Sequence, residues 1–89
     1  MKSTDLETSI TVTYRSGIHP ERGWDMVHVI YHRSDQVLAS FEVARMGSDI
    51  YRKTDVILDR WERVSNPEDL TELRKHFMVR DRAISMDAR

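Results

Sequence analysis

Apolar and polar residues alternate along three short segments in the first half of the chain. In residues 9–15, SITVTYR, the alternation has the period of a strand with one buried face. Residues 24–32 and 36–44 are rich in β-branched and aromatic side chains, and a tight turn at residues 33–36 separates them. Residues 16–23 contain two glycines and a proline, which predicts a connecting loop. The pattern predicts an antiparallel meander of three strands.

The register of the hairpin formed by residues 24–32 and 36–44 decides which side chains share a face. A loop of two or four residues pairs Ile30 with Ala39, whereas a loop of three residues pairs Tyr31 with Ala39. The second register gathers the apolar residues better, but the sequence Ser-Asp-Gln lacks the glycine that three-residue loops favour. Both registers therefore stay open. In either one, the sheet face away from the helices carries several large apolar side chains.

Two amphipathic helices are expected after the sheet. Residues 48–64 carry an apolar stripe at helical spacing, with Ser48 as a possible N-cap and charged residues on the opposite side. A second start signal follows, because Asn66 suits an N-cap and Pro67 suits a first helical turn. Beyond His76 the pattern fits either a continued helix or a short strand, and we expect the helix to continue to about residue 82. Its apolar stripe consists of Leu70, Leu73 and Phe77.

The expected fold is a small α+β domain with the element order β-β-β-α-α. A chain of 89 residues has the length of one domain, with the sheet in residues 9–44 and the helices in residues 48–82. Residues 1–8 and 83–89 lack a clear period and are expected to form a loose N-terminus and a frayed tail. A core of this size is modest, so association with another chain is plausible.

The composition excludes several kinds of chemistry. The chain has no cysteine, which excludes disulfides, thiolate zinc sites and cysteine nucleophiles. It has no glycine-rich phosphate loop and no metalloprotease or serine-hydrolase motif, so neither a cofactor nor an enzymatic activity is expected. No apolar run approaches the about 20 residues of a membrane helix, and the N-terminus lacks a signal sequence. We expect a cytoplasmic protein without a membrane partner.

Three of the four histidines have a spacing or a neighbourhood that could indicate metal binding or catalysis. His28 and His32 are four residues apart, which on a helix suits zinc, but on a strand their Cα atoms are about 13 Å apart and cannot share one ion. The sequence therefore predicts no metal site there. His19 lies in the loop near Glu21 and Arg22, and this cluster carries the hypothesis of an enzyme subunit or weak hydrolase.

Two tryptophans and a fourth histidine are expected to have structural roles or, for one tryptophan, to contact a partner. Trp61 falls on the apolar stripe of the first expected helix and is predicted to be core. Trp24, at a strand end, is expected either to cap the core or to anchor a partner. His76 is expected near a helix end, in solvent or beside the terminal carbonyls.

Basic residues gather at the C-terminal end of the chain. Residues 73–89 contain five Lys or Arg against two Asp, although the formal net charge of the whole chain is −1. A nucleic-acid-binding regulator is thus the alternative function, but the balanced charge makes nucleic acid an unlikely partner. The residues that would contact phosphates are Arg74, Lys75, Arg80 and Arg82.

The function that fits these features best is a non-enzymatic protein-interaction module. A second apolar sheet face is typical of an interaction surface, which suggests a small regulator or inhibitor docking on a larger protein, or a homodimer through that face. Such proteins are of the kind carried by phages and other mobile elements. The expected contact residues are Trp24, Met26, His28, Ile30, His32 and Leu38, with His19 and Arg22 from the loop.

Overall fold

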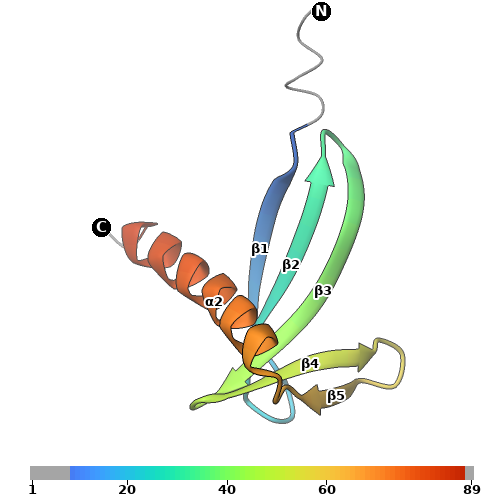
Figure 1. Cartoon of the computed structure of the whole chain (residues 1–89), viewed down its shortest axis with the longest axis vertical. Helices are drawn as coiled ribbons and strands as arrows, with labels where there is room; N and C mark the ends of the chain where they lie inside the picture. The colour runs from blue at the N-terminus through green and yellow to red at the C-terminus, as the bar shows by residue number, and fades with distance from the viewer. Residues whose placement is uncertain (1–8, 88–89) are drawn as a thin grey trace, which may run out of the picture.

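The structure, a computed structural model, describes residues 9–87, so the expectations for residues 1–8 and 88–89 lie outside it. Five strands form one antiparallel sheet in the order β1-β2-β3-β4-β5, and one helix follows them (Figure 1). The elements are β1 (Thr11–Ile18), β2 (Asp25–Arg33), β3 (Gln36–Met46), β4 (Asp49–Asp55), β5 (Arg60–Arg63) and α2 (Pro67–Asp87).

The predicted order β-β-β-α-α is therefore wrong, although the α+β class and the antiparallel meander are confirmed. Residues 48–64, predicted as a helix, form the hairpin β4–β5. Ser48, the expected N-cap, lies in the tight turn between β3 and β4, beside Gly47 with its left-handed φ of 60°. The helix α2 continues to Asp87, past the expected end at residue 82.

Local hydrogen bonds explain why residues 48–64 turn back on themselves. The Asp55 carboxylate accepts the backbone N–H groups of Ile57 and Leu58, both at 3.0 Å, which satisfies in a turn the donors that a helix would use. Asp59 follows with a φ of 53°, a left-handed conformation that a continuous right-handed helix cannot contain. The segment is also rich in β-branched and aromatic residues, so strand pairing overrides the helical spacing.

The hairpin β2–β3 combines features of both registers that the sequence left open. Its turn has two residues, with Arg33 opposite Gln36, as in the register expected for a loop of two or four residues. One residue later the register shifts at a β-bulge, where Leu38 is the extra residue. Beyond the bulge Tyr31 pairs with Ala39, as in the register that gathers the apolar residues. The bulge thus supplies the shift that a glycine-containing three-residue loop would otherwise provide.

Side chains alternate between the two faces of the sheet. One face packs against α2, and its core consists of Val27, Val29, Val43, Ile50, Leu73 and Phe77. Tyr14, Tyr31, Phe41, Val64 and Leu70 surround this core. The other face, which we call the open face, carries the alternate residues of β2, namely Met26, His28, Ile30 and His32.

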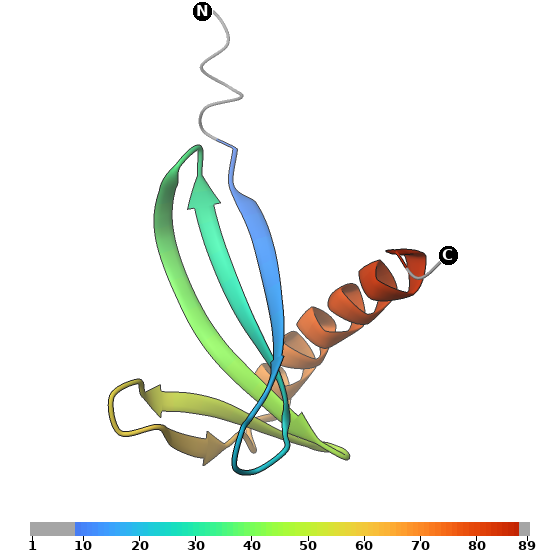
Figure 2. The same ribbon diagram turned by 180° about the vertical axis from the view of Figure 1, so that it is seen from behind.

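The helix α2 begins as the sequence predicted. The Asn66 side chain accepts the backbone N–H groups of Glu68 and Asp69, at 2.9 and 3.1 Å, and thereby caps the first turn. From there α2 crosses the sheet from the β4 side toward β1, and its C-terminal end projects away from the strands (Figures 1 and 2). No helix in the part of the chain described here is long and apolar enough to cross a bilayer.

An ion network fastens the middle of α2 to the sheet. Arg80 is buried and binds the Asp25 carboxylate through two nitrogens, at 2.8 and 2.7 Å. Asp81 and Arg45 complete the network, because Arg45 binds both carboxylates. Both guanidinium groups lie over the ring of Phe77, with distances of 5.3 and 4.7 Å to its centroid. The hydrogen bonds from Arg80 lower the pKa of Asp25.

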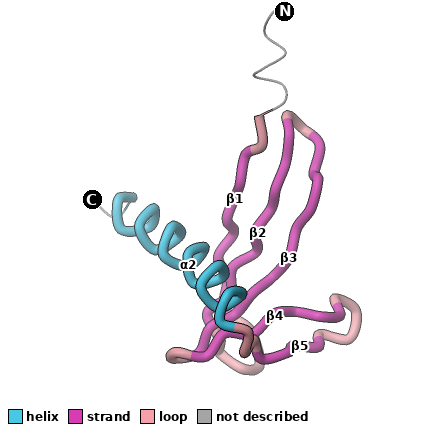
Figure 3. The backbone as a smooth tube through the Cα atoms, in the orientation of Figure 1, coloured by secondary structure: helices cyan, strands magenta, loops and turns pink. Residues whose placement is uncertain are grey.

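The strands β4 and β5 leave the direction of the longer strands and run across the lower end of β3 (Figures 1 and 3). Only the last four residues of β3, from Val43 to Met46, pair with β4. The upper half of β3 therefore borders solvent, and the hairpin β4–β5 projects to one side. This projection positions the candidate site.

Candidate functional site

The turn between β4 and β5 exposes three consecutive aliphatic side chains. Val56, Ile57 and Leu58 are 75%, 92% and 58% exposed, and we call these residues the apolar tip. The Asp55 carboxylate holds the backbone of the tip through the N–H groups of Ile57 and Leu58. Large aliphatic groups in a fixed turn lose little entropy on binding, so the tip has the properties of an interface anchor.

Asp59 fixes the base of the apolar tip. Its Oδ2 lies 2.9 Å from Nε2 of His19, and its Oδ1 accepts the indole N–H of Trp61 at 2.9 Å. Lys53 Nζ lies 3.5 Å from the same Oδ1. The hydrogen bond from His19, followed by that from Trp61, lowers the pKa of Asp59, so this side chain stays a carboxylate.

His19 ties the loop between β1 and β2 to the turn of the β4–β5 hairpin. Its Nδ1 accepts the backbone N–H groups of Glu21 and Arg22, at 3.2 and 3.0 Å. The proton of the ring therefore resides on Nε2, which donates to Asp59. The side chain is only 2% exposed. Both ring nitrogens are engaged, so His19 has no free nitrogen with which to transfer a proton to or from a substrate.

An aromatic cluster supports this arrangement on the open-face side of the hairpin. Trp24 stacks on Tyr51 with ring centroids 4.3 Å apart, and it meets Trp61 edge to face at 5.8 Å. Arg22 lies over Trp24 and Lys53 lies over Trp61. Trp61 is predicted to be core on the apolar stripe of a helix, whereas in the structure it lies on β5 and is partly buried in this cluster. The cluster gives the apolar tip a rigid base.

The open face lies beside this cluster and is half exposed. Ile30 and His32 contribute to a shallow pocket of about 370 Å³, in which His32 Nε2 lies 2.7 Å from Thr13 Oγ1. The other lining residues are Arg15, Ser34, Asp35 and Val37. His28 and His32 occupy one strand, as the sequence predicted. Among the side chains that the structure describes, no three His, Asp or Glu residues are grouped so that they could hold a metal ion.

The structure brings some of the expected contact residues together and removes others from the surface. Met26, His28, Ile30 and His32 share the half-exposed open face, Leu38 is exposed at the bulge, and Arg22 is exposed in the loop. Trp24 and His19 are buried and have internal partners, so their side chains do not offer a surface to another molecule.

Sequence reasoning missed the apolar tip because its residues fitted a helical stripe. The available signal was the succession Asp55, three aliphatic residues and Asp59, since aspartates favour turns and three consecutive apolar residues break the alternation of a strand.

The four basic residues proposed for phosphate contacts do not form one free surface. Arg80 is buried in its ion network, and Arg74 donates to the backbone carbonyl of Ser48 at 3.0 Å. Lys75 and Arg82 are exposed on α2. The hypothesis of nucleic-acid binding therefore gains no support from their placement.

His76 is buried rather than solvated, contrary to expectation. Its Nδ1 lies 2.9 Å from the hydroxyl of Tyr14, and its Nε2 lies 3.4 Å from the hydroxyl of Tyr31. Burial lowers the pKa of His76, and burial likewise raises the pKa of Tyr14. A pocket of about 350 Å³ opens beside the ring, between Tyr31, Phe41 and α2.

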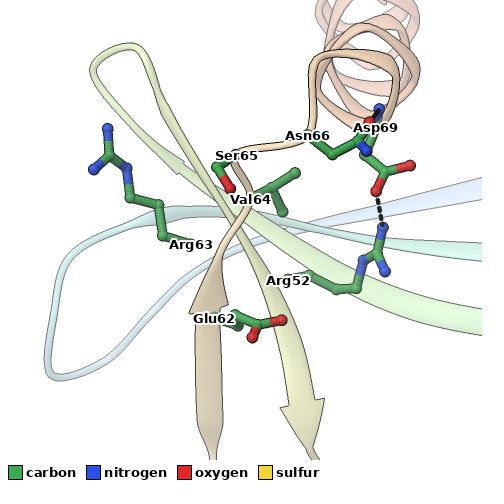
Figure 4. Close-up of a pocket in the computed structure, with 7 residues that line it drawn as sticks. All are labelled: Arg52, Glu62, Arg63, Val64, Ser65, Asn66 and Asp69. Carbon is green, nitrogen blue, oxygen red and sulfur yellow. Dashed lines mark hydrogen bonds and ion pairs between the residues drawn. The ribbon is translucent and has the colours of Figure 1, made fainter.

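A polar pocket of about 210 Å³ lies at the junction of β5 and α2 (Figure 4). On one side Arg52 points to Asp69, with 3.8 Å between the charged groups, and Asn66 caps the helix. Arg63 points away from them and pairs with Asp49 at 3.4 Å. Both arginines thus pair with acidic side chains of the same chain.

Comparisons with known proteins give no family for this chain. No family model matches it, and neither the curated proteins nor the solved structures contain a match.

Proposed function

We propose that this chain is a non-enzymatic interaction module that docks on a larger protein through the apolar tip and the adjoining open face. The exposure of Val56, Ile57 and Leu58 carries the proposal. A soluble surface gains nothing by exposing three adjacent aliphatic groups, whereas a partner with an apolar pocket would remove them from water. Burial of a side chain of this size contributes about 1.5–3 kcal/mol.

The surroundings of the apolar tip support docking rather than catalysis. The two side chains beside it, Asp55 and Asp59, are occupied by backbone and imidazole donors and hold its shape. His19, the candidate catalytic residue, also holds the shape of the apolar tip, because its imidazole binds Asp59. The hypothesis of a small regulator or inhibitor, of the kind carried by mobile elements, is consistent with an exposed apolar tip whose shape is fixed by internal hydrogen bonds.

The experiment compares two exposed positions that differ in location. Ile57→Glu places a charge on the apolar tip, and Met78→Glu places the same charge on an exposed part of α2. Each tagged chain is used to capture proteins from the cells that naturally produce it. A protein retained by the wild type and by Met78→Glu, but lost with Ile57→Glu, would support the proposal. Retention by Ile57→Glu would show that docking uses another surface.

A further inference from the structure

The strand β1 has an unpaired edge. It is the outermost strand, and within residues 9–87 no strand pairs with its outer side. The N–H of His19 donates to the carbonyl of Trp24, and hydrogen-bonded pairs alternate along an antiparallel ladder, so the odd-numbered residues of β1 bond to β2. The backbone groups that point outward are those of Val12, Tyr14, Ser16 and Ile18.

The other free edges of the sheet have features that hinder pairing with another strand, whereas the edge of β1 has none of these features. The edge strand β5 has only four residues, and the upper half of β3 carries the bulge at Leu38. The eight residues of β1 include no proline and no bulge, and Arg15 is their only charged side chain. An edge of this kind is a template for another strand.

The helix α2 overhangs this edge. Arg80 reaches Ser16 on β1 at 3.3 Å, and the rest of the helix extends past β1, where Figures 1 and 2 show no strand beneath it. A strand added beside β1 would therefore lie against the C-terminal part of α2. That strand would gain both backbone hydrogen bonds and a cover for one face.

Exposed apolar side chains border the space beside β1 and beneath the C-terminal part of α2. Val79 is 50% exposed, and helical spacing places it and Ala83 on the same flank of α2 as His76. Val12 pairs with Tyr31 and so lies on the sheet face that α2 covers, yet Val12 itself remains exposed. The single chain leaves both valines uncovered next to an unpaired strand.

We propose that two copies of the chain associate through antiparallel pairing of their β1 strands about a two-fold axis, which joins the two sheets into one. The outward backbone N–H and C=O groups belong to even-numbered residues. Two β1 strands can therefore form hydrogen bonds only in a register that places even-numbered residues of one strand opposite even-numbered residues of the other. With Tyr14 opposite the partner's Tyr14, residues 11–17 of both strands overlap. The other register of equal overlap places Arg15 opposite the partner's Arg15, and directly opposed like charges are destabilising.

In this arrangement each α2 covers the partner subunit's β1. The overhanging end of the helix would shield the partner's Val12, and Val79 would lie near the partner's Ala83, whose small side chain allows the two helices to approach. The apolar tip lies at the opposite side of the sheet and stays free, so a dimer would present two tips to a partner with repeated sites. This inference does not depend on the docking function proposed above.

The first test measures the mass of the purified 89-residue chain by light scattering over a range of concentrations. We expect twice the 10.5 kDa of one chain at high concentration. Val79→Glu should raise the dissociation constant by about tenfold or more, while Met78→Glu, on the side of α2 that borders the turn between β3 and β4, should leave it unchanged. A monomer at every concentration, or equal effects of the two variants, would overturn the proposal.

The second test locates the interface and its register. In the proposed register Thr13 lies opposite the partner's Arg15 in a pair without mutual hydrogen bonds, the closer kind of pair, which suits a disulfide. The chain has no other cysteine, so the double variant Thr13→Cys with Arg15→Cys should form a covalent dimer under mild oxidation. The single variants Thr13→Cys and Arg15→Cys should not. A cross-link in either single variant would contradict this register, and none in the double variant would contradict the interface.

Discussion

Nε2 of His19 lies 2.9 Å from Oδ2 of Asp59, although 40 residues separate them in the sequence. This hydrogen bond joins the loop between β1 and β2 to the turn between β4 and β5. It makes the position of the apolar tip depend on a distant loop, because the same imidazole also accepts two backbone N–H groups of that loop.

Replacing His19 by Ala should destabilise the domain and loosen the apolar tip. The N–H groups of Glu21 and Arg22 would lose their acceptor, which costs roughly 1–3 kcal/mol of unfolding free energy. Asp59 would lose one of its anchors, so amide exchange should accelerate in residues 55–60. Urea denaturation and hydrogen exchange measure the two effects. Unchanged exchange in the turn would show that the aromatic cluster alone holds it.

Replacing Ile57 by Ser should leave the stability of the domain unchanged within about 0.5 kcal/mol, because the side chain is 92% exposed and packs against nothing that holds the fold. The midpoint of urea unfolding checks this directly. A clear loss of stability would mean that the apolar tip serves the fold, and the argument for docking would lose its basis.

The hairpin and the start of the helix could be predicted from the sequence because short-range physics determines them. Alternation and β-branched residues identified β2 and β3, and Asn66 before Pro67 located the first turn of α2. In both places local preference and tertiary structure agree, which is the condition for a local prediction to succeed.

The hairpin β4–β5 could not be predicted because its apolar side chains lie on both faces of the sheet and in solvent. Ile50 packs against α2, Trp61 packs on the opposite side, and Ile57 is exposed, yet their spacing imitates one helical stripe. The candidate site was missed for the same reason. The contact between His19 and Asp59, which organises the site, joins two loops that no local pattern relates.

Arg80 should contribute much more to stability than its exposed neighbour Arg82. Removing the guanidinium in Arg80→Ala leaves Asp25 without its bidentate partner, which should lower the free energy of unfolding by about 2–4 kcal/mol, less than for a fully buried pair because Asp25 is partly exposed. Arg82→Ala is the matched control and should change stability little. Equal effects of the two substitutions would show that the network contributes nothing.

His76 should make the domain less stable in mild acid. Burial lowers the pKa of its imidazole in the folded chain, although nearby Glu72 opposes this shift. The unfolded chain therefore takes up a proton below about pH 6.5 that the folded chain refuses, so stability falls as the pH decreases, by at most about 1.4 kcal/mol per pH unit. In His76→Gln this contribution should disappear. Urea midpoints between pH 8 and 5 compare the two proteins, and parallel curves would contradict the expectation.

Deleting Leu38 should preserve the fold, because Leu38 is the extra residue of the bulge. Without it the two-residue turn leads directly to the pairing of Tyr31 with Ala39, and every core residue of β3 keeps its face. Deleting Ile30 from β2 instead shifts one part of that strand to the wrong face and should prevent folding. Far-ultraviolet circular dichroism and urea unfolding distinguish the two outcomes. The Leu38 deletion should also aggregate more readily, since a regular outer edge of β3 is open to pairing with other chains. If this deletion unfolded the domain, the bulge would have a role in the core that the pairing of the strands does not reveal.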